Sequence, residues 1–149
     1  MIYACLMITT LKKGKNNVND LLLDKRRVLI VDDDADSREV LAQVLQTQGY
    51  QAFQAENGQQ ALDLLRSVPP PPGLILLDLD MPVMDGREFL SRLPQLPGAR
   101  PVVIVITGQD PRGIPGAAAV LRKPVSLSQL LGVMQALMIL SEKYDGEGN

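Results

Sequence analysis

The sequence predicts an α/β protein whose strands form an open, parallel sheet. Three apolar runs, at 27–31, 74–77 and 101–106, have the length and aliphatic composition of buried strands. The segments between them space their apolar residues as amphipathic helices do. Alternation of this kind implies parallel strands joined by right-handed crossovers. With 149 residues, the chain is long enough for one domain with a substantial core.

The first half of the chain alternates strand and helix twice. After the first strand, an apolar stripe predicts a helix over 36–48, which Gly49 would end with a left-handed cap. A weakly alternating strand is expected at 50–55 and a second helix at 59–68. Four prolines at 69–72 end that helix and form a stiff connection. The stripe of the first helix consists of Val40, Leu41, Val44 and Leu45.

The second half repeats the alternation with shorter elements. A helix at 85–93 follows the wholly apolar second run and is cut off by Pro94. After the third run, a last short strand contains Val120-Leu121. Ser126 then opens the final helix, and Gln129 completes a capping box. The apolar face of this helix consists of Leu127, Leu130, Leu131, Met134, Leu137 and Met138.

Composition narrows the classes of function. The chain has no histidine, which excludes histidine-based acid/base catalysis and histidine metal ligands. Aromatic residues make up only 3%, which argues against a base-stacking surface for nucleic acid. The single cysteine, Cys5, cannot form an internal disulfide, in keeping with a reducing cytoplasm. We therefore expect a cytoplasmic protein.

Charge is unevenly distributed, and this suggests three segments. Residues 1–27 contain six basic and two acidic side chains, a net charge of +4, and the remainder has a net charge of −6. An acidic body argues against DNA binding. We expect an extension at 1–25 that is poorly ordered, a domain at 26–141 and a disordered tail at 142–149. The apolar start at 1–11 is too short for a membrane span and lacks the layout of a signal peptide. A docking strand, a disordered leader and an artefact of an upstream start codon remain alternatives for it.

Charged residues recur where the predicted strands end. Asp32-Asp33-Asp34 follows the first strand, Asp78 follows the second apolar run, and Lys123-Pro124 follows the last strand. In a parallel α/β sheet these ends meet at one crevice, the usual ligand site. Clustered carboxylates repel unless a cation joins them, and oxygen ligands suit Mg²⁺. The pattern indicates an acidic magnesium pocket with a lysine beside it, able to receive a phosphoryl group.

The same residues resemble a known family. Val28-Leu-Ile-Val-Asp-Asp-Asp34, Leu76–Gly86, Ile106-Thr-Gly108 and Lys123-Pro124 resemble the receiver domain of bacterial two-component response regulators, and the resemblance covers about residues 26–141. Its most specific part is the stretch from Asp78 to Gly86. The resemblance implies a flavodoxin-like, doubly wound sheet of five strands in the order 2-1-3-4-5.

The resemblance also implies a role for each site residue. Asp78 matches the phosphoacceptor, and Asp32 and Asp33 match the acidic pair that holds Mg²⁺ together with it. Asp80 matches the position whose backbone carbonyl completes the metal shell. Lys123 matches the lysine that pairs with the acceptor and then with a phosphoryl oxygen.

Thr107 matches the hydroxyl that turns to hydrogen-bond the phosphoryl group. Structural alternatives stand beside these roles. Asp78 can cap the turn that follows it. The first acidic run can serve as first-turn helix acids, which is what we expect of Asp34 and Asp36.

Two departures from the family concern signal output. Thr107 and Lys123 are closer together than is usual in the family, and Gly108–Gly116 contains two prolines and several glycines. We therefore predict that the helix between the last two strands is lost or reduced to a single turn. Val120 stands where the family usually carries a switch tyrosine or phenylalanine, and it cannot perform an aromatic rotation.

Three functions follow from these residues. The first is a stand-alone receiver, phosphorylated on Asp78 by a sensor histidine kinase or phosphotransfer protein with Mg²⁺. It would signal to a downstream protein by contact or phosphorelay and would be no enzyme beyond slow autodephosphorylation. The second is an interaction domain that keeps the pocket without using phosphorylation. The third is a dehalogenase-type phosphatase, because Asp78-Leu79-Asp80 resembles its motif; Pro82 and the short chain argue against it.

Overall fold

The computed structural model describes residues 26–97 and 101–145. The extension expected at 1–25 and residues 146–149 of the expected tail lie outside the described residues. Five parallel strands form one sheet in the order β2-β1-β3-β4-β5, which confirms the predicted flavodoxin-like topology. The strands are β1 (Arg27–Val31), β2 (Gln51–Ala55), β3 (Leu74–Leu77), β4 (Val102–Thr107) and β5 (Ala119–Arg122).

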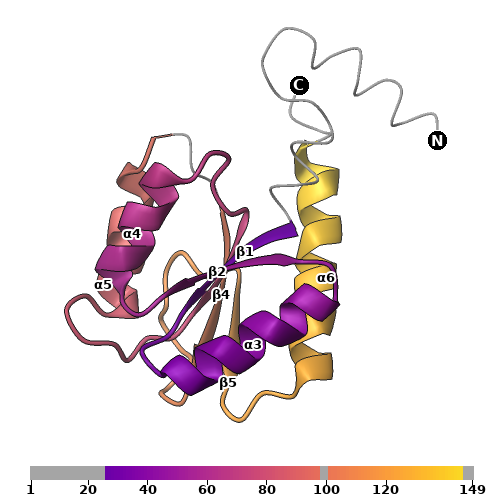
Figure 1. The fold of residues 1–149 in the computed structure, drawn as a ribbon, viewed down its shortest axis with the longest axis horizontal. Coiled ribbons are helices and arrows are strands. Elements are labelled where there is room, and N and C mark those ends of the chain that lie inside the picture. Colours follow the sequence, from indigo (N-terminus) through magenta and orange to yellow (C-terminus); the bar gives the residue numbers. More distant parts are fainter. Residues whose placement is uncertain (1–25, 98–100, 146–149) are drawn as a thin grey trace, which may run out of the picture.

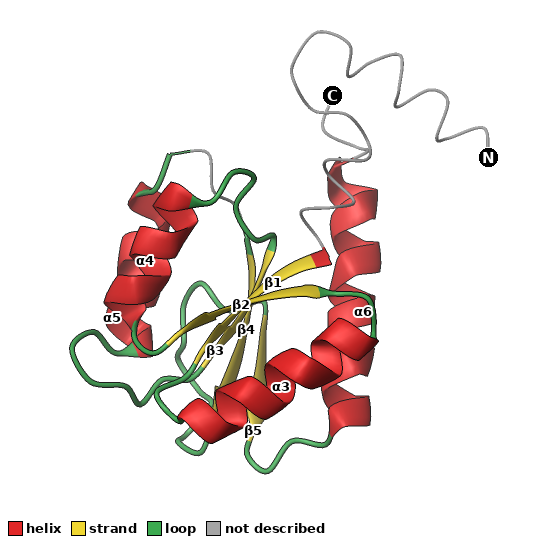
Figure 2. Cartoon of the chain, viewed as in Figure 1, coloured by secondary structure: helices red, strands yellow, loops and turns green. Residues whose placement is uncertain are grey.

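Helices cover both faces of the sheet, as a doubly wound fold requires (Figure 1). Helices α4 and α5 lie on one face, and α3 and α6 lie on the other (Figure 2). Among the described residues, no helix has the length and apolar character needed to cross a membrane. The helices are α3 (Ala35–Thr47), α4 (Gly58–Ser67), α5 (Gly86–Arg92), followed by one 3₁₀ turn at Leu93–Gln95, and α6 (Leu127–Asp145).

The strands that lie inside the sheet are buried on both faces. In β1, Leu29 and Val31 face α4 and α5, while Val28 and Ile30 face α3 and α6. The same alternation holds in β3 and β4, because successive side chains of a strand point to opposite faces. This explains why these strands appear in the sequence as continuous apolar runs.

The predicted loss of one helix is confirmed. Residues 108–118, between β4 and β5, contain turns and bends and no helix. We call this segment the β4–β5 loop. Gly113 and Gly116 adopt positive φ angles of 68° and 90°, which an α-helix cannot contain. Ile114 and Ala117 pack against the core face that α4 and α5 cover, so the loop occupies part of the place of a helix.

Two predicted core positions are exposed instead. Val40 in α3 is 62% exposed and Leu127 in α6 is 42% exposed. The buried stripe of α3 contains Ala42 and Leu45, and Val40 lies about 200° around the helix from Ala42. Leu127 is the first residue of α6, one turn before Leu130, which is buried. Ala42, rather than Val40, therefore faces the sheet.

Helix ends follow the predicted capping residues. Gly49 follows α3 with a φ angle of 87°, as expected of a left-handed cap. The Ser126 hydroxyl accepts a hydrogen bond from the backbone N–H of Gln129 (3.1 Å) and so caps α6. That helix continues to Asp145, past the domain end expected at residue 141. It contains no proline, and its single glycine, Gly132, does not interrupt it.

Candidate functional site

Four neighbouring strands end at one crevice, and each contributes a polar side chain there. Asp32 and Asp33 follow β1, Asp78 follows β3, Thr107 is the last residue of β4, and Lys123 follows β5. The strands are parallel and in register, so their carboxyl ends lie at the same edge of the sheet. Crossovers on opposite faces leave this edge open, and that is where α/β folds bind ligands.

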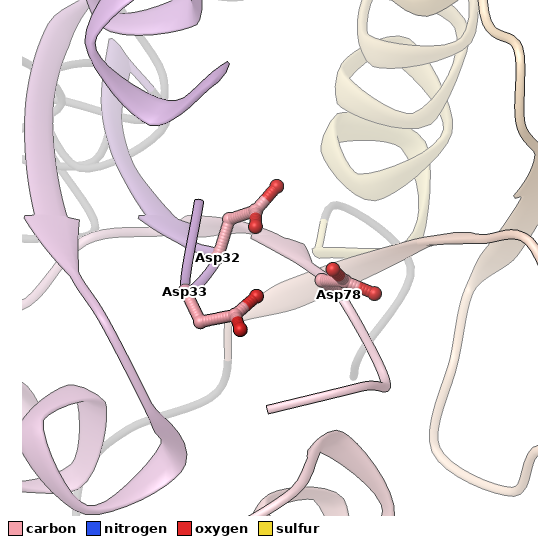
Figure 3. Close-up of side chains that lie close together, drawn as sticks. All are labelled: Asp32, Asp33 and Asp78. Carbon is pink, nitrogen blue, oxygen red and sulfur yellow. The ribbon is translucent and has the colours of Figure 1, made fainter. Parts of the chain in front are cut away.

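Three carboxylates form the acidic centre of the crevice. Asp32, Asp33 and Asp78 each place a carboxylate oxygen within 4.8 Å of the others (Figure 3). Two come from consecutive residues of one chain segment and the third from the neighbouring strand (Figure 3). The backbone holds them in place, because the Asp78 N–H donates to the Val31 carbonyl (2.9 Å) and the Asp32 N–H to the Ala55 carbonyl (3.1 Å).

Asp78 is the most enclosed of the three and is paired with the lysine. Its side chain is 10% exposed, and Lys123 Nζ lies 3.3 Å from Asp78 Oδ2. Its other oxygen, Oδ1, accepts a hydrogen bond from the Asp80 N–H (3.2 Å). Asp78 therefore also caps the turn that follows it, as the structural alternative predicted. It does so through Oδ1, while Oδ2 faces Lys123. The peptide bond between Lys123 and Pro124 is cis.

Asp32 is held where its negative charge is disfavoured. Burial raises the pKa of Asp32, and the charges of Asp78 and Asp33 raise it further. The Asp34 N–H, which donates to Asp32 Oδ1 (2.9 Å), and the charge of Lys123 oppose that rise in pKa. A bound cation would remove the repulsion, so the cluster has the electrostatic character of a cation site.

The neighbouring acids Asp34 and Asp36 serve the helix, as the sequence suggested. Asp34 is the N-cap of α3 and accepts hydrogen bonds from the N–H groups of Asp36 (3.1 Å) and Ser37 (3.3 Å). The Ser37 hydroxyl also donates to Asp34, and these bonds lower the pKa of the Asp34 carboxyl. The acidic run is thus divided between a cluster at the strand end and a cap for the helix.

The segment after Asp78 is shaped by a glycine and a strained valine. A Cβ atom at Gly86 would lie 2.6 Å from the Asp78 carbonyl oxygen and 2.8 Å from the Leu79 Cα, so no larger residue fits without a shift. Val83 has a φ angle of 68°, and the Met84 N–H donates to the Pro82 carbonyl (2.7 Å) across it. This arrangement is a γ-turn of the rare, strained form. The Val83 side chain at its centre is 83% exposed.

Thr107 and Asp80 are joined by a residue that the sequence did not single out. The Thr107 side chain is buried, and its hydroxyl accepts a hydrogen bond from the Gln109 N–H (3.0 Å). The side-chain amide of Gln109 donates to the Asp80 carboxylate. Asp80 was predicted to act through its backbone carbonyl, and the structure adds a partner for its side chain. The only sequence signal for Gln109 is its place two residues after the threonine.

Two open cavities meet the site from different sides. A cleft of about 850 Å³ runs between α3 and the start of α6, and reaches Asp32, Asp78 and Lys123. Val40 of α3 and Leu127 of α6, both exposed aliphatic residues, line it. A second, more polar cavity of about 510 Å³ lies beside Asp33, Asp80 and Gln109. The Asp78 carboxylate can therefore be approached from solvent.

The donor set fits Mg²⁺. Carboxylate oxygens are the only side-chain ligand atoms within the cluster, and hard oxygen ligands suit Mg²⁺. Asp33 is exposed, which leaves room for the waters that this ion keeps. Lys123 Nζ, 3.3 Å from Asp78 Oδ2, places a positive charge beside the cluster.

A family model confirms the resemblance seen in the sequence. The response regulator receiver domain model matches residues 28–135. Response regulator MprA of Mycolicibacterium vanbaalenii is 37% identical over 128 residues, which are 82% of this chain and 54% of that protein. Sporulation initiation phosphotransferase F of Bacillus subtilis is 48% identical over 67 residues, 45% of this chain and 52% of that protein. The chain thus spans about half the length of these curated relatives.

Solved structures show the same fold. A CheY-like receiver domain protein from Methanospirillum hungatei has a TM-score of 0.70 and 29% identity, covering 79% of this chain and 97% of that one. Response regulator TrrA of Thermotoga maritima, solved in complex with Mg²⁺-BeF, has a TM-score of 0.66 and 29% identity, covering 74% and 97%.

Proposed function

This chain belongs to the response regulator receiver domain family, and we propose that Asp78 is its phosphoacceptor, receiving a phosphoryl group from a phosphohistidine. The observation that supports the proposal most directly is the position of Asp78 Oδ2, 3.3 Å from Lys123 Nζ and next to two further carboxylates. A dehalogenase-type phosphatase does not fit the family match, so we do not retain that alternative.

In the proposed reaction, a carboxylate oxygen of Asp78 forms a bond to phosphorus while the bond between phosphorus and the donor imidazole nitrogen breaks. The electron pair of that bond returns to the imidazole, which takes up a proton from solvent. Lys123 supplies a positive charge next to the acceptor and would pair with a phosphoryl oxygen after the transfer. Thr107 contributes a hydroxyl from the end of β4.

Asp32, Asp33 and Asp78 would hold Mg²⁺, with the Asp80 backbone carbonyl as a further ligand. When bound, the ion neutralises the negative charge that gathers on the phosphoryl oxygens. Burial and the charges of Asp78 and Asp33 raise the pKa of Asp32, and a cation held by these carboxylates would relieve that repulsion, which supports this assignment. The TrrA structure in complex with Mg²⁺-BeF supports it by analogy.

The proposed donor is a sensor histidine kinase or a phosphotransfer protein, and the proposed receiver of the signal is a downstream protein. The cleft between α3 and α6 gives a protein donor a route to Asp78. We also propose slow autodephosphorylation and a cytoplasmic location. The stand-alone arrangement stays a prediction, because the matches cover only 54% and 52% of the two relatives.

A second candidate is an interaction domain that does not use phosphorylation as its switch. Its support is the absence of a helix at residues 108–118, together with aliphatic Val120 at the position of the family's switch aromatic. Val120 is partly buried against the core, so its side chain is held in place.

Intact mass spectrometry after incubation with Mg²⁺ and acetyl phosphate tests the proposal. The protein should gain one phosphoryl group, and Asp78→Ala should gain none. Asp63→Ala is a matched control, because Asp63 is an exposed carboxylate on α4 that pairs with Arg66 and is not part of the acidic cluster. It should be labelled like the unmodified protein.

Transfer from a phosphorylated histidine phosphotransfer domain, followed in the same way, tests the donor. Equal labelling of the Asp78→Ala variant would refute Asp78 as the acceptor. Absence of labelling from both donors, with Mg²⁺ bound, would favour the phosphorylation-independent interaction domain.

A further inference from the structure

Arg38, near the start of α3, holds the backbone of the acidic cluster. Its Nη1 donates a hydrogen bond to the Asp32 carbonyl (2.6 Å), and its Nε donates to the side chain of Gln54 (3.2 Å) in the edge strand β2. The Arg38 side chain is half-buried between these partners. A guanidinium presents its donors in a fixed plane, so it orients the groups that it binds.

Asp32 is held by its neighbours at three points. Its N–H donates to the Ala55 carbonyl (3.1 Å), and its Oδ1 accepts a hydrogen bond from the Asp34 N–H (2.9 Å). Its carbonyl is the remaining backbone group, and that group is the one that Arg38 binds. Because a peptide unit is planar, fixing this carbonyl also fixes the direction of the Asp33 N–H, and so the orientation in which Asp33 leaves β1.

Asp33 depends on that peptide unit more than the other carboxylates of the cluster do. Its side chain is exposed, and within the described part of the chain no hydrogen bond holds its carboxylate. Even so, its carboxylate oxygen lies within 4.8 Å of ligand atoms of Asp32 and Asp78 (Figure 3). The backbone therefore directs Asp33 toward the cluster, and Arg38 is a side chain that fixes this backbone.

The acceptors of Arg38 favour a role in orienting the cluster over a role in neutralising it. Among the described residues, its side-chain hydrogen bonds go to a carbonyl and to an amide oxygen, and neither goes to a carboxylate. An arginine bound to the carboxylates would compete with a cation for their oxygens. An arginine bound to the backbone orients these oxygens and leaves their lone pairs open.

We propose that Arg38 is a positioning residue for a divalent cation, which fixes the peptide between Asp32 and Asp33 so that both carboxylates meet Asp78. This inference rests on the proposed function and adds a residue outside the ligand set. Two simpler roles compete with it. Arg38 could act only through its positive charge, or it could serve only to join α3 to β2.

Titration with Mg²⁺ alone, followed by NMR of the backbone amides, separates these roles. Arg38→Ala should weaken Mg²⁺ binding about ten-fold, the lower end of the effect of residues that orient metal ligands. Loss of a positive charge by itself would strengthen the binding of a cation, so the direction of the change distinguishes positioning from charge. Arg38→Lys keeps the charge and one donor and should recover part of the affinity.

A second measurement needs no metal. A hydrogen bond to a carbonyl polarises its peptide unit and shifts the ¹⁵N resonance of the following amide, which here belongs to Asp33. In Arg38→Ala without Mg²⁺, the Asp33 ¹⁵N resonance should move upfield, and Arg38→Lys should restore much of the shift. Arg38→Met retains the apolar stem without the donors, and it replaces Arg38→Ala should that variant not fold.

Two control variants address the competing roles. Gln54→Ala removes side-chain links between α3 and β2, because Gln54 accepts from Arg38 and donates to Glu39 (3.1 Å). Arg66→Ala removes an exposed arginine of α4 that pairs with Asp63. Both should change the dissociation constant of Mg²⁺ by less than about two-fold, since exposed polar and ionic contacts contribute little.

Each outcome decides the question. Unchanged or tighter Mg²⁺ binding in folded Arg38→Ala overturns this inference and leaves the proposed function intact. Equal weakening by Gln54→Ala overturns it as well, because the link between α3 and β2 would then be the cause. Failure of the unmodified protein to bind Mg²⁺ removes the proposed metal site and this inference with it, whereas labelling of Asp78 tests the acceptor separately.

Discussion

Neutralising Asp32 should stabilise the folded protein when no divalent metal is present. In Asp32→Asn, the amide oxygen can still accept the hydrogen bond that the Asp34 N–H donates to Asp32 Oδ1 (2.9 Å). The substitution therefore removes a charge and keeps the local geometry. Three mutually repelling carboxylates become two.

The size of the effect follows from the distances in the cluster. Unit charges 4.8 Å apart repel by roughly 3.5 kcal/mol at an effective dielectric constant of about 20, and by about 0.9 kcal/mol in water. Attraction between Asp32 and Lys123 opposes the repulsion. Because Asp32 is partly exposed, solvent screening places the net gain near the lower limit, at about 1–2 kcal/mol in the free energy of unfolding.

Urea denaturation in EDTA at several pH values checks both magnitude and sign. The pKa of Asp32 is raised in the folded state, so its charge costs stability above that pKa. As the pH falls through the folded pKa and then below the unfolded value of about 3.9, both states become protonated and the cost vanishes. The advantage of Asp32→Asn should therefore be largest at neutral pH and disappear in acid.

Magnesium should reverse the order of stability. At a hundred-fold excess over the dissociation constant, binding stabilises the unmodified protein by about 2.7 kcal/mol, a gain that Asp32→Asn should largely lose. Asp36→Asn is the control, because Asp36 is an exposed first-turn acid of α3, and it should gain no stability in EDTA. Equal or lower stability of Asp32→Asn in EDTA at neutral pH would refute the repulsion argument.

Three further substitutions test the packing around the site. Val83→Asn should raise the free energy of unfolding in urea by about 1 kcal/mol, because asparagine tolerates the positive φ of 68°; no gain would show that the γ-turn is unstrained. Gly86→Ala should lower the free energy of unfolding by about 2 kcal/mol and slow labelling of Asp78. The control Gly132→Ala should be neutral or stabilising, because a Cβ at Gly132 would meet no atom within 4 Å. Similar losses of stability in both variants would contradict the contact between residue 86 and the Asp78 carbonyl. Phe89→Ala should cost about 3–5 kcal/mol in thermal or urea unfolding, since Phe89 is fully buried in the core, and a loss below 1 kcal/mol would contradict that burial.

Local patterns in the sequence were sufficient for most of the fold. Continuous aliphatic runs predicted β1, β3 and β4, because strands covered on both faces contain few polar residues. Proline and glycine at 108–116 predicted that no helix forms between β4 and β5. Proline removes a helical hydrogen bond, and glycine disfavours helical backbone angles. The strand order came from the resemblance to receiver domains.

The candidate site was also largely predictable. Asp32, Asp78 and Lys123 each directly follow a strand, and Asp33 comes one residue later. Parallel strands bring such residues together at one edge of the sheet. Their roles stay predictions until labelling and metal binding are measured.

Contacts between segments distant in the chain could not be read from periodicity. Val40 belongs to a helical stripe in the sequence, yet α3 buries Ala42 and Leu45 against the sheet and leaves Val40 exposed. The bond between Gln109 and Asp80 depends on how the β4–β5 loop settles over α5. The spacing of residues reports which face of an element is apolar and where elements end. The orientation of elements, and the partners of polar side chains at their ends, depend on the packing of the whole sheet with its helices.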